Sequence, residues 1–165
     1  MIILGVDPGI QHTGYAILYF KAEQFEILNF GSIDTDKFDV FTLRLKKIYD
    51  GLCEIIKQHK IDCMSLEEIF YSRNVKVALK MGHARGVALL AAANHQIPVA
   101  EYSAKEVKMS VTGNGNASKY QVQQMIGRLL QLPTIPSIFD VTDAMAVAYC
   151  HSRRAIPIYE KVLHT

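Results

Sequence analysis

The chain has 165 residues, enough for one domain and too few for two of ordinary size. Half of the residues are hydrophobic and 21% are charged, which excludes collagen, coiled-coil and disordered proteins. No apolar run reaches the ~18 residues of a membrane span, and the opening Met1-Ile2-Ile3-Leu4 lacks the basic segment of a signal peptide. Three scattered cysteines (Cys53, Cys63 and Cys150) match neither a disulfide framework nor a zinc site. We therefore expect a soluble, cytoplasmic protein with no membrane partner.

The net charge of +2 hides an uneven distribution. Residues 1–69 hold seven Lys/Arg and eleven Asp/Glu, whereas residues 70–130 hold eight Lys/Arg and two Asp/Glu. A basic middle beside an acidic first half is typical of an enzyme that binds a polyanion and has a carboxylate site. An ordinary solvated surface would explain the same pattern, so charge alone does not decide.

The first half of the chain predicts three strands and a helix. Residues 2–6 form an apolar run that the turn residues Asp7-Pro8-Gly9 close, which is typical of a strand buried on both faces. Residues 15–20 and 25–33 are rich in aromatic and β-branched residues and predict two more strands of an antiparallel meander. From Phe41 to Ile55 the apolar residues follow the spacing of an amphipathic helix.

The second half predicts alternating strands and helices. Strands are expected over 63–66 and 98–102, and helices over 75–93, from Ser103, over 118–130 and from about Asp140 to His151. Ser103 and Ser118 each begin a capping-box pattern. The order predicts an α/β fold, with a mixed five-stranded sheet flanked by helices, in one domain over 1–151 and a C-terminal tail over 152–165.

Acidic residues end two of the predicted strands and open the last helix. Asp7 follows the first strand, Glu67 and Glu68 end the fourth, and Asp140 and Asp143 share one helix face. Ligands collect at the carboxyl ends of strands in mixed sheets, so we expect these carboxylates to converge. Strand periodicity alone does not choose between Glu67 and Glu68.

Clustered carboxylates need a compensating positive charge. Oxygen ligands without His or Cys favour Mg²⁺ or Mn²⁺, and a pair of such ions suits phosphodiester hydrolysis. Each residue alone also has a structural explanation: Asp140 as a helix cap, Asp143 as a partner of the helix dipole and Asp7 as a turn residue. The Asp-x-Gly turn also occurs in actin-like ATPases and sugar kinases, but that fold uses two such domains. Taken together, the pattern favours a metal site.

Motifs from Ile2 to about His151 resemble the RuvC-type Holliday junction resolvases. The matching segments are Ile3-Leu4-Gly5-Val6-Asp7-Pro8-Gly9, Thr13-Gly14-Tyr15, Leu66-Glu67-Glu68-Ile69-Phe70, Asn74, residues 78–86, Val107-Lys108, Lys119, Gln121-Val122, Leu132-Pro133 and Asp140-Val141-Thr142-Asp143-Ala144. Several motifs in the right order are far more specific than any one of them.

The resemblance implies a ribonuclease H-like fold whose catalytic, metal-binding acids are Asp7, Glu67, Asp140 and Asp143. Some members place a histidine at the last position, whereas Asp143 keeps this site all-carboxylate. Lys119 is expected to stabilise charge in the transition state. The resemblance also implies a homodimer that nicks four-way DNA junctions symmetrically with two Mg²⁺ ions per site, with Mn²⁺ as a substitute. A branch-migration helicase complex is a further expected partner.

The basic middle supplies the candidate DNA contacts. The resemblance assigns base stacking to Phe70 and phosphate contacts to Lys108 and Lys119; the alternatives are a core aromatic and solvated helix surfaces. Tyr71-Ser72-Arg73 departs from the family pattern. The other candidate contacts are Tyr71, Arg73, Asn74, Lys76, Lys80 and Lys105.

The sequence therefore predicts a metal-dependent endonuclease that resolves Holliday junctions in recombination and repair. Two alternatives remain open: a ribonuclease H-like nuclease acting on RNA or ribosomal RNA precursors, and a junction-binding protein without catalysis. Cleavage of RNA instead of a four-way junction would identify the ribonuclease alternative. A junction complex that stays uncleaved would identify the binding protein.

Overall fold

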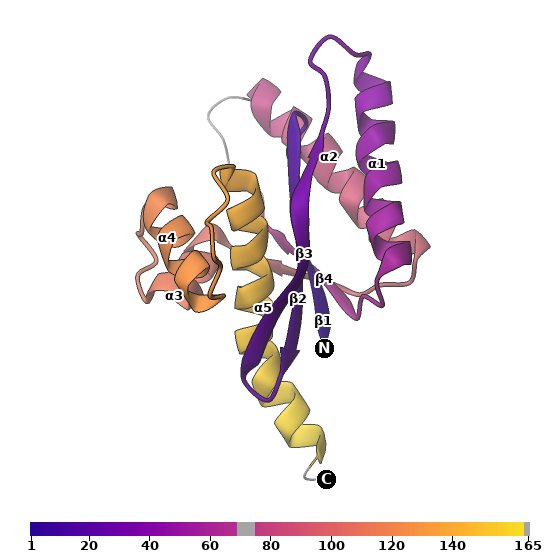
Figure 1. The fold of residues 1–165 in the computed structure, drawn as a ribbon. Helices are drawn as coiled ribbons and strands as arrows, with labels where there is room; N and C mark the ends of the chain where they lie inside the picture. Colours follow the sequence, from indigo (N-terminus) through magenta and orange to yellow (C-terminus); the bar gives the residue numbers. More distant parts are fainter. Residues whose placement is uncertain (69–74, 164–165) are drawn as a thin grey trace.

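The computed structural model describes the backbone of residues 1–68 and 75–163, and the side chains of these segments up to Arg154. The elements in chain order are β1 (Ile2–Asp7), β2 (His12–Lys21), β3 (Gln24–Asp34), α1 (Phe41–Gln58), β4 (Cys63–Glu67), α2 (Val75–Asn94), β5 (Val99–Tyr102), α3 (Ala104–Thr112), α4 (Lys119–Leu129) and α5 (Phe139–Leu163). Figure 1 shows their arrangement. The predicted order of strands and helices is confirmed.

The five strands form one mixed sheet in the order β3-β2-β1-β4-β5. The three N-terminal strands are an antiparallel meander, and β4 and β5 extend it in parallel with β1. β1 is central and reads as an almost continuous apolar run because helices cover both faces of the sheet. This arrangement confirms the predicted fold class.

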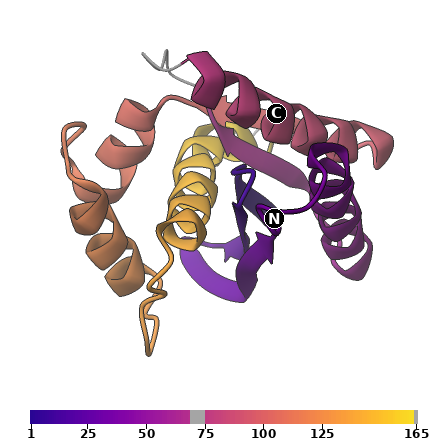
Figure 2. The same ribbon diagram turned by 90° about the horizontal axis from the view of Figure 1, so that it is seen from above.

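Helices cover the two faces of the sheet with separate apolar clusters. On one face α1 and α2 enclose a core around Leu4, Val6 and Leu66. On the other face α3, α4 and α5 enclose a core around Ile3, Leu18 and Met145. Figure 2 shows the sheet between these two helical layers. No helix in the part of the chain that the structure describes is long and apolar enough to cross a membrane.

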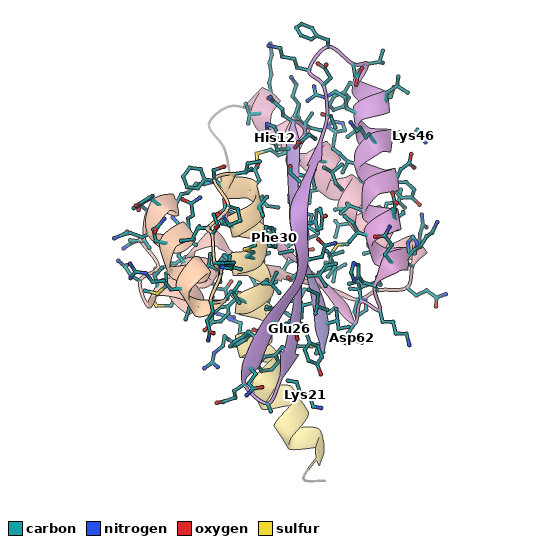
Figure 3. All side chains as sticks on the ribbon, viewed as in Figure 1. His12, Lys21, Glu26, Phe30, Lys46 and Asp62 are labelled. Atoms are coloured by element: carbon teal, nitrogen blue, oxygen red, sulfur yellow. The ribbon has the colours of Figure 1, made fainter. Side chains whose placement is uncertain are left out.

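Helix α5 lies directly on the meander because two glycines leave room for its backbone. A Cβ atom at Gly14 would overlap the main chain of Asp140, and one at Gly5 would overlap the carbonyl oxygen of Ala144. A Cβ at Gly5 would also lie 2.9 Å from the Cβ of Ala148. The first turn of α5 is therefore held against the end of β1 and the start of β2. Figure 3 shows His12 at this end of the sheet and Lys21 at the opposite end.

The final helix is longer than the sequence pattern predicts. It was expected to end at about His151, with a tail over 152–165, but α5 continues to Leu163. The packing does not stop at His151: Ser152 is fully buried and its hydroxyl donates to the carbonyl of Tyr149. Arg154 then pairs with Glu106 of α3 at 2.8 Å. Most of the predicted tail is thus helical, and a domain boundary at residue 151 stays a prediction.

The contact between Gly14 and α5 predicts a stability effect. Gly14→Ala forces the start of α5 away from the sheet. The added methyl would overlap backbone atoms of Asp140 and Val141, which cannot move aside by a side-chain rotation. We expect a loss of about 1–3 kcal/mol in the free energy of unfolding, the usual range for overpacking. Urea denaturation measures it, and an unchanged midpoint would contradict this close approach.

Candidate active site

Strand register brings Asp7 and Glu67 to the same place. Val6 of β1 pairs with Leu66 of β4 in parallel, so the next residues along the two strands, Asp7 and Glu67, end neighbouring strands side by side. Glu68 is exposed, and its backbone N–H donates to the carbonyl of Tyr102. The register therefore places Glu67, and not Glu68, beside Asp7, which periodicity alone left open.

Helix α5 brings the other two acids to this edge of the sheet. Asp140 and Asp143 lie in its first turns, and both line a pocket of about 320 Å³ together with Asp7 and Glu67. The remaining lining comes from Pro8, Gly9, Met81, Ala104, Val107, Lys108, Lys119 and Val122. We call this the acid pocket. It contains all four predicted metal-binding acids.

The turn that follows Asp7 is held by hydrogen bonds from three directions. The Thr13 hydroxyl donates to the carbonyl of Gly9 at 2.7 Å. The carbonyl of Ile10 accepts from the Thr35 hydroxyl at 2.5 Å and from the Arg44 guanidinium at 3.2 Å. These bonds fix one wall of the acid pocket, because Pro8 and Gly9 belong to its lining.

Lys119 reaches into the acid pocket from the first turn of α4. The helix begins at a complete capping box, in which the Ser118 hydroxyl accepts from the backbone N–H of Gln121 and the Gln121 side chain accepts from the N–H of Ser118. The Lys119 ammonium donates to Oδ2 of Asp143 at 2.8 Å. The Asp143 side chain is 16% exposed and that of Lys119 is 64% exposed, so the ion pair lies at the mouth of the pocket.

Burial, and then the charges of neighbouring carboxylates, raise the pKa of three acids in this pocket. Burial and the charges of Asp143 and Asp140 raise the pKa of Asp7 from 3.8 to about 7, against the opposing charge of Lys119. Burial, with the charge of Asp143, also raises the pKa of Glu67. Burial likewise raises the pKa of Asp140. The site therefore holds more negative charge than it can keep without a cation.

Lys119 supplies part of the missing positive charge. Burial opposes its charge, but the hydrogen bond to Asp143 and the charges of Asp143, Asp7 and Asp140 outweigh burial and raise the pKa of the ammonium. Lys108 also lines the pocket and acts on Glu67 as a nearby positive charge. Two lysines thus face four acids, which leaves a net negative site.

The donor set of the acid pocket suits a hard cation. Four carboxylates with no His or Cys provide the oxygen ligands that Mg²⁺ and Mn²⁺ favour. Within residues 1–68 and 75–154, no three His, Cys, Asp or Glu side chains enclose a single point as a finished metal cage. Ligation would require the carboxylates to draw together and Asp143 to exchange the Lys119 ammonium for the ion. The chemistry of the donors fits such an ion.

The other candidate residues divide into three groups. Lys108 and Lys119 line the acid pocket. Lys76 and Lys80 on α2 and Lys105 on α3 are exposed side chains outside its lining. The remaining candidates, Phe70, Tyr71, Arg73 and Asn74, lie outside the described residues. Their proposed DNA contacts stay predictions.

Apolar residues of the pocket wall were absent from the predicted site. The two valines Val107 and Val122 lie in the lining. Val122 is one helical turn after Lys119, and Val107 directly precedes Lys108. The i, i+3 spacing of Lys119 and Val122 was a usable signal, because residues three apart share a helix face. Met81 carried no such signal, since only the packing of α2 brings it there.

Comparison with known proteins identifies the relatives of this fold and site. A family model described as crossover junction endodeoxyribonuclease RuvC matches residues 3–151. The chain belongs to the RuvC family. A RuvC protein of Desulforamulus reducens is 50% identical over 153 residues, which cover 93% of this chain and 94% of that protein.

Solved structures agree with this family membership. The Thermus thermophilus RuvC in complex with its Holliday junction substrate superposes with a TM-score of 0.88 and is 30% identical, over 94% of each chain. The yeast mitochondrial Holliday junction resolvase Ydc2 superposes with a TM-score of 0.65 at 12% identity, over 96% of this chain and 82% of that one, which shows a shared fold. The fold is therefore the ribonuclease H-like fold of the RuvC family.

The raised pKa of Asp7 predicts how stability depends on pH in the metal-free protein. The folded state binds the proton more tightly than the unfolded state, because the pKa rises from 3.8 to about 7 on folding. The contribution of this group is fully present below 3.8 and is lost as the pH rises through about 7. Asp7→Asn should remove this loss and stabilise the metal-free protein above neutral pH by at most about 4 kcal/mol.

Thermal melts in a chelator at about pH 5 and about pH 8 measure this effect. Asp39→Asn is the matched control, because Asp39 is an exposed carboxylate outside the acid pocket. If the Asp7 and Asp39 variants showed the same dependence on pH, the raised pKa of Asp7 would be refuted.

Proposed function

We propose that this chain is a Holliday junction endonuclease that hydrolyses one phosphodiester bond in each of two opposed strands. Asp7, Glu67, Asp140 and Asp143 hold the metal ions, two per site, with Mg²⁺ as the ion and Mn²⁺ as a substitute. Lys119 and Lys108 contact the phosphate. The observation that carries the proposal is the single pocket of a RuvC-family fold in which β1, β4 and α5 place four carboxylates and α3 and α4 place two lysines.

The residues of the pocket divide the work of hydrolysis. When bound, the ions would activate water and stabilise the leaving 3′ oxygen. The four carboxylates fix the position of the positive charge, because they come from the ends of two strands and one helix rather than from a loop. The Lys119 ammonium, once it leaves Asp143, is placed to donate to an oxygen of the scissile phosphate.

Purified protein incubated with a synthetic four-way junction and Mg²⁺ tests this function. We expect paired nicks at opposed strands of the junction and none in linear duplex of the same sequence. An RNA–DNA hybrid is the third substrate. Cleavage of the hybrid with an intact junction would favour the ribonuclease alternative, and a stable uncleaved junction complex would favour a binding protein without catalysis.

Neighbouring glutamates provide a matched pair of variants. Glu67→Gln should lower the nicking rate by about a hundredfold or more at saturating Mg²⁺, because a neutral amide replaces a charged ligand in the pocket. Glu68→Gln changes an exposed side chain outside the lining and should retain most activity. Rates measured under single-turnover conditions compare the two. The reverse result would mean that the site uses the other face of β4.

A homodimer is the second part of the proposal. Two symmetric nicks need two active sites, and a two-fold junction is matched by a two-fold protein. The exposed apolar face of α2 supports self-association: Leu79 and Leu90, which are 59% and 53% exposed, line a shallow groove of about 500 Å³ with Leu45 of α1 and Val87. A branch-migration helicase partner and a cytoplasmic location stay predictions.

The α2 groove predicts which variant prevents dimerisation. Leu90→Glu should weaken self-association on the order of a hundredfold or more, since burying one leucine contributes about 1.5–3 kcal/mol and a two-fold interface counts it twice. Leu28→Glu is the control, because Leu28 is 41% exposed on β3 and lies outside the groove. Analytical ultracentrifugation measures both. A Leu90→Glu protein that still forms dimers would place the interface elsewhere.

A further inference from the structure

The chain is free of acidic residues between Glu106 and Asp140. This stretch of 33 residues, 107–139, contains Lys108, Lys119 and Arg128 and no Asp or Glu. It includes most of α3, all of α4 and the connections around them. Lys108 and Lys119 face the acid pocket, but Arg128 lies in the last turn of α4, nine residues beyond Lys119. The proposed catalytic role therefore leaves one cation of this stretch unexplained.

Arg128 lines a second pocket of about 440 Å³ between the end of α3 and the outer face of α4. Tyr120, Gln124 and Arg128 line it from α4 together with Gln121 and Met125. Thr112, Asn114 and Ala117 line it from the end of α3 and the loop after it. No acidic residue belongs to the lining. We call this pocket the α4 groove.

Three polar α4 side chains of the groove have no partner within the described residues, whereas Gln121 is held by the capping box. Tyr120, Gln124 and Arg128 are four residues apart and so lie in one row along the helix. In the described part of the chain none of the three makes a side-chain hydrogen bond or ion pair, although Tyr120 is 63% exposed. By contrast, Thr112 and Asn114 are used by the turn, where the Thr112 hydroxyl donates to the carbonyl of Lys108. The row offers a phenol, an amide and a guanidinium.

The groove starts at the same end of α4 as the acid pocket, on another face of the helix. Lys119 starts α4 with its ammonium on Asp143, and Tyr120 is the next residue. At 1.5 Å per residue, the row from Tyr120 to Arg128 extends about 12 Å away from the acid pocket. A DNA strand advances about 3.4 Å per nucleotide, so this length spans roughly three nucleotides. The groove is thus placed to follow a strand that leaves the acid pocket.

We propose that the α4 groove binds the sugar–phosphate backbone of the junction arm next to the cleaved bond, with Arg128 contacting a phosphate roughly three nucleotides from it. This inference rests on the proposed function. A backbone ligand fits because the groove has Arg128 as its one charged residue, no acid, and the donors Tyr120 and Gln124, which bind phosphate and sugar without reading bases. A protein partner is the competing occupant, and the experiment separates the two.

Salt-dependent junction affinity tests the groove. Fluorescence anisotropy without divalent cations, so that no strand is cut, measures binding to a four-way junction with long arms and to one whose arms end before the row. The variants are Arg128→Ala and Arg128→Lys. The matched control is Arg153→Ala, an exposed arginine on α5 about 20 Å along the helix axis from Asp140.

We expect Arg128→Ala to flatten the slope of log K against log salt by about 1 on the long-armed junction, because one phosphate contact is lost. Arg128→Lys should keep the slope, since a lysine still neutralises a phosphate, and Arg153→Ala should leave it unchanged. On the short-armed junction, Arg128→Ala and the original protein should bind alike.

An unchanged slope for Arg128→Ala on the long-armed junction would overturn the inference and assign the row to a protein partner. An equal loss on both junctions would also overturn it, because the contact would then lie at the crossover rather than on the arm. Neither result touches the proposed function, which depends on whether the original protein nicks the junction in Mg²⁺. Failure of that nicking, with binding retained, would instead reject the endonuclease proposal.

Discussion

The approach of α5 to the sheet is the contact on which the acid pocket depends. Gly5 and Gly14 have no side chain where they face the helix, and the facing residues Ala144 and Ala148 of α5 have small side chains. A larger residue at either glycine would lift α5 from β1 and β2, because its first added atom would overlap main-chain atoms. Two acids of the pocket belong to that helix, so the arrangement of the four carboxylates and the packing of the core are set by the same contact.

The acid pocket also costs stability. Asp7 loses solvation and lies near Asp140 and Asp143, so folding brings together charges that repel each other. Lys119 reduces this cost through its ion pair with Asp143. Two buried cores, one on each face of the sheet, hold the elements in place against that repulsion. Such a trade between stability and activity is common in enzymes.

Positive charge comes from a different part of the fold than negative charge. The acids lie on the ends of β1 and β4 and on α5, whereas Lys108 and Lys119 come from α3 and α4. The capping boxes at Ser103 and Ser118 fix where those two helices begin. Because each helix starts at a fixed residue, the position of its lysine on the helix surface is fixed as well. The pocket therefore lies between the acidic edge of the sheet and two helices that each contribute a lysine.

Local chemistry determined much of this protein from the sequence alone. The apolar run before Asp7, the spacing from Phe41 onward and both capping boxes predict elements that the structure confirms, because each depends on residues close along the chain. Only the tertiary structure decided the rest. The pairing of Val6 with Leu66 places Glu67 rather than Glu68 beside Asp7. The burial of Ser152 and the ion pair of Arg154 with Glu106 continue the packing of α5 beyond His151. Strand register and helix length depend on partners distant in the sequence, which periodicity cannot detect.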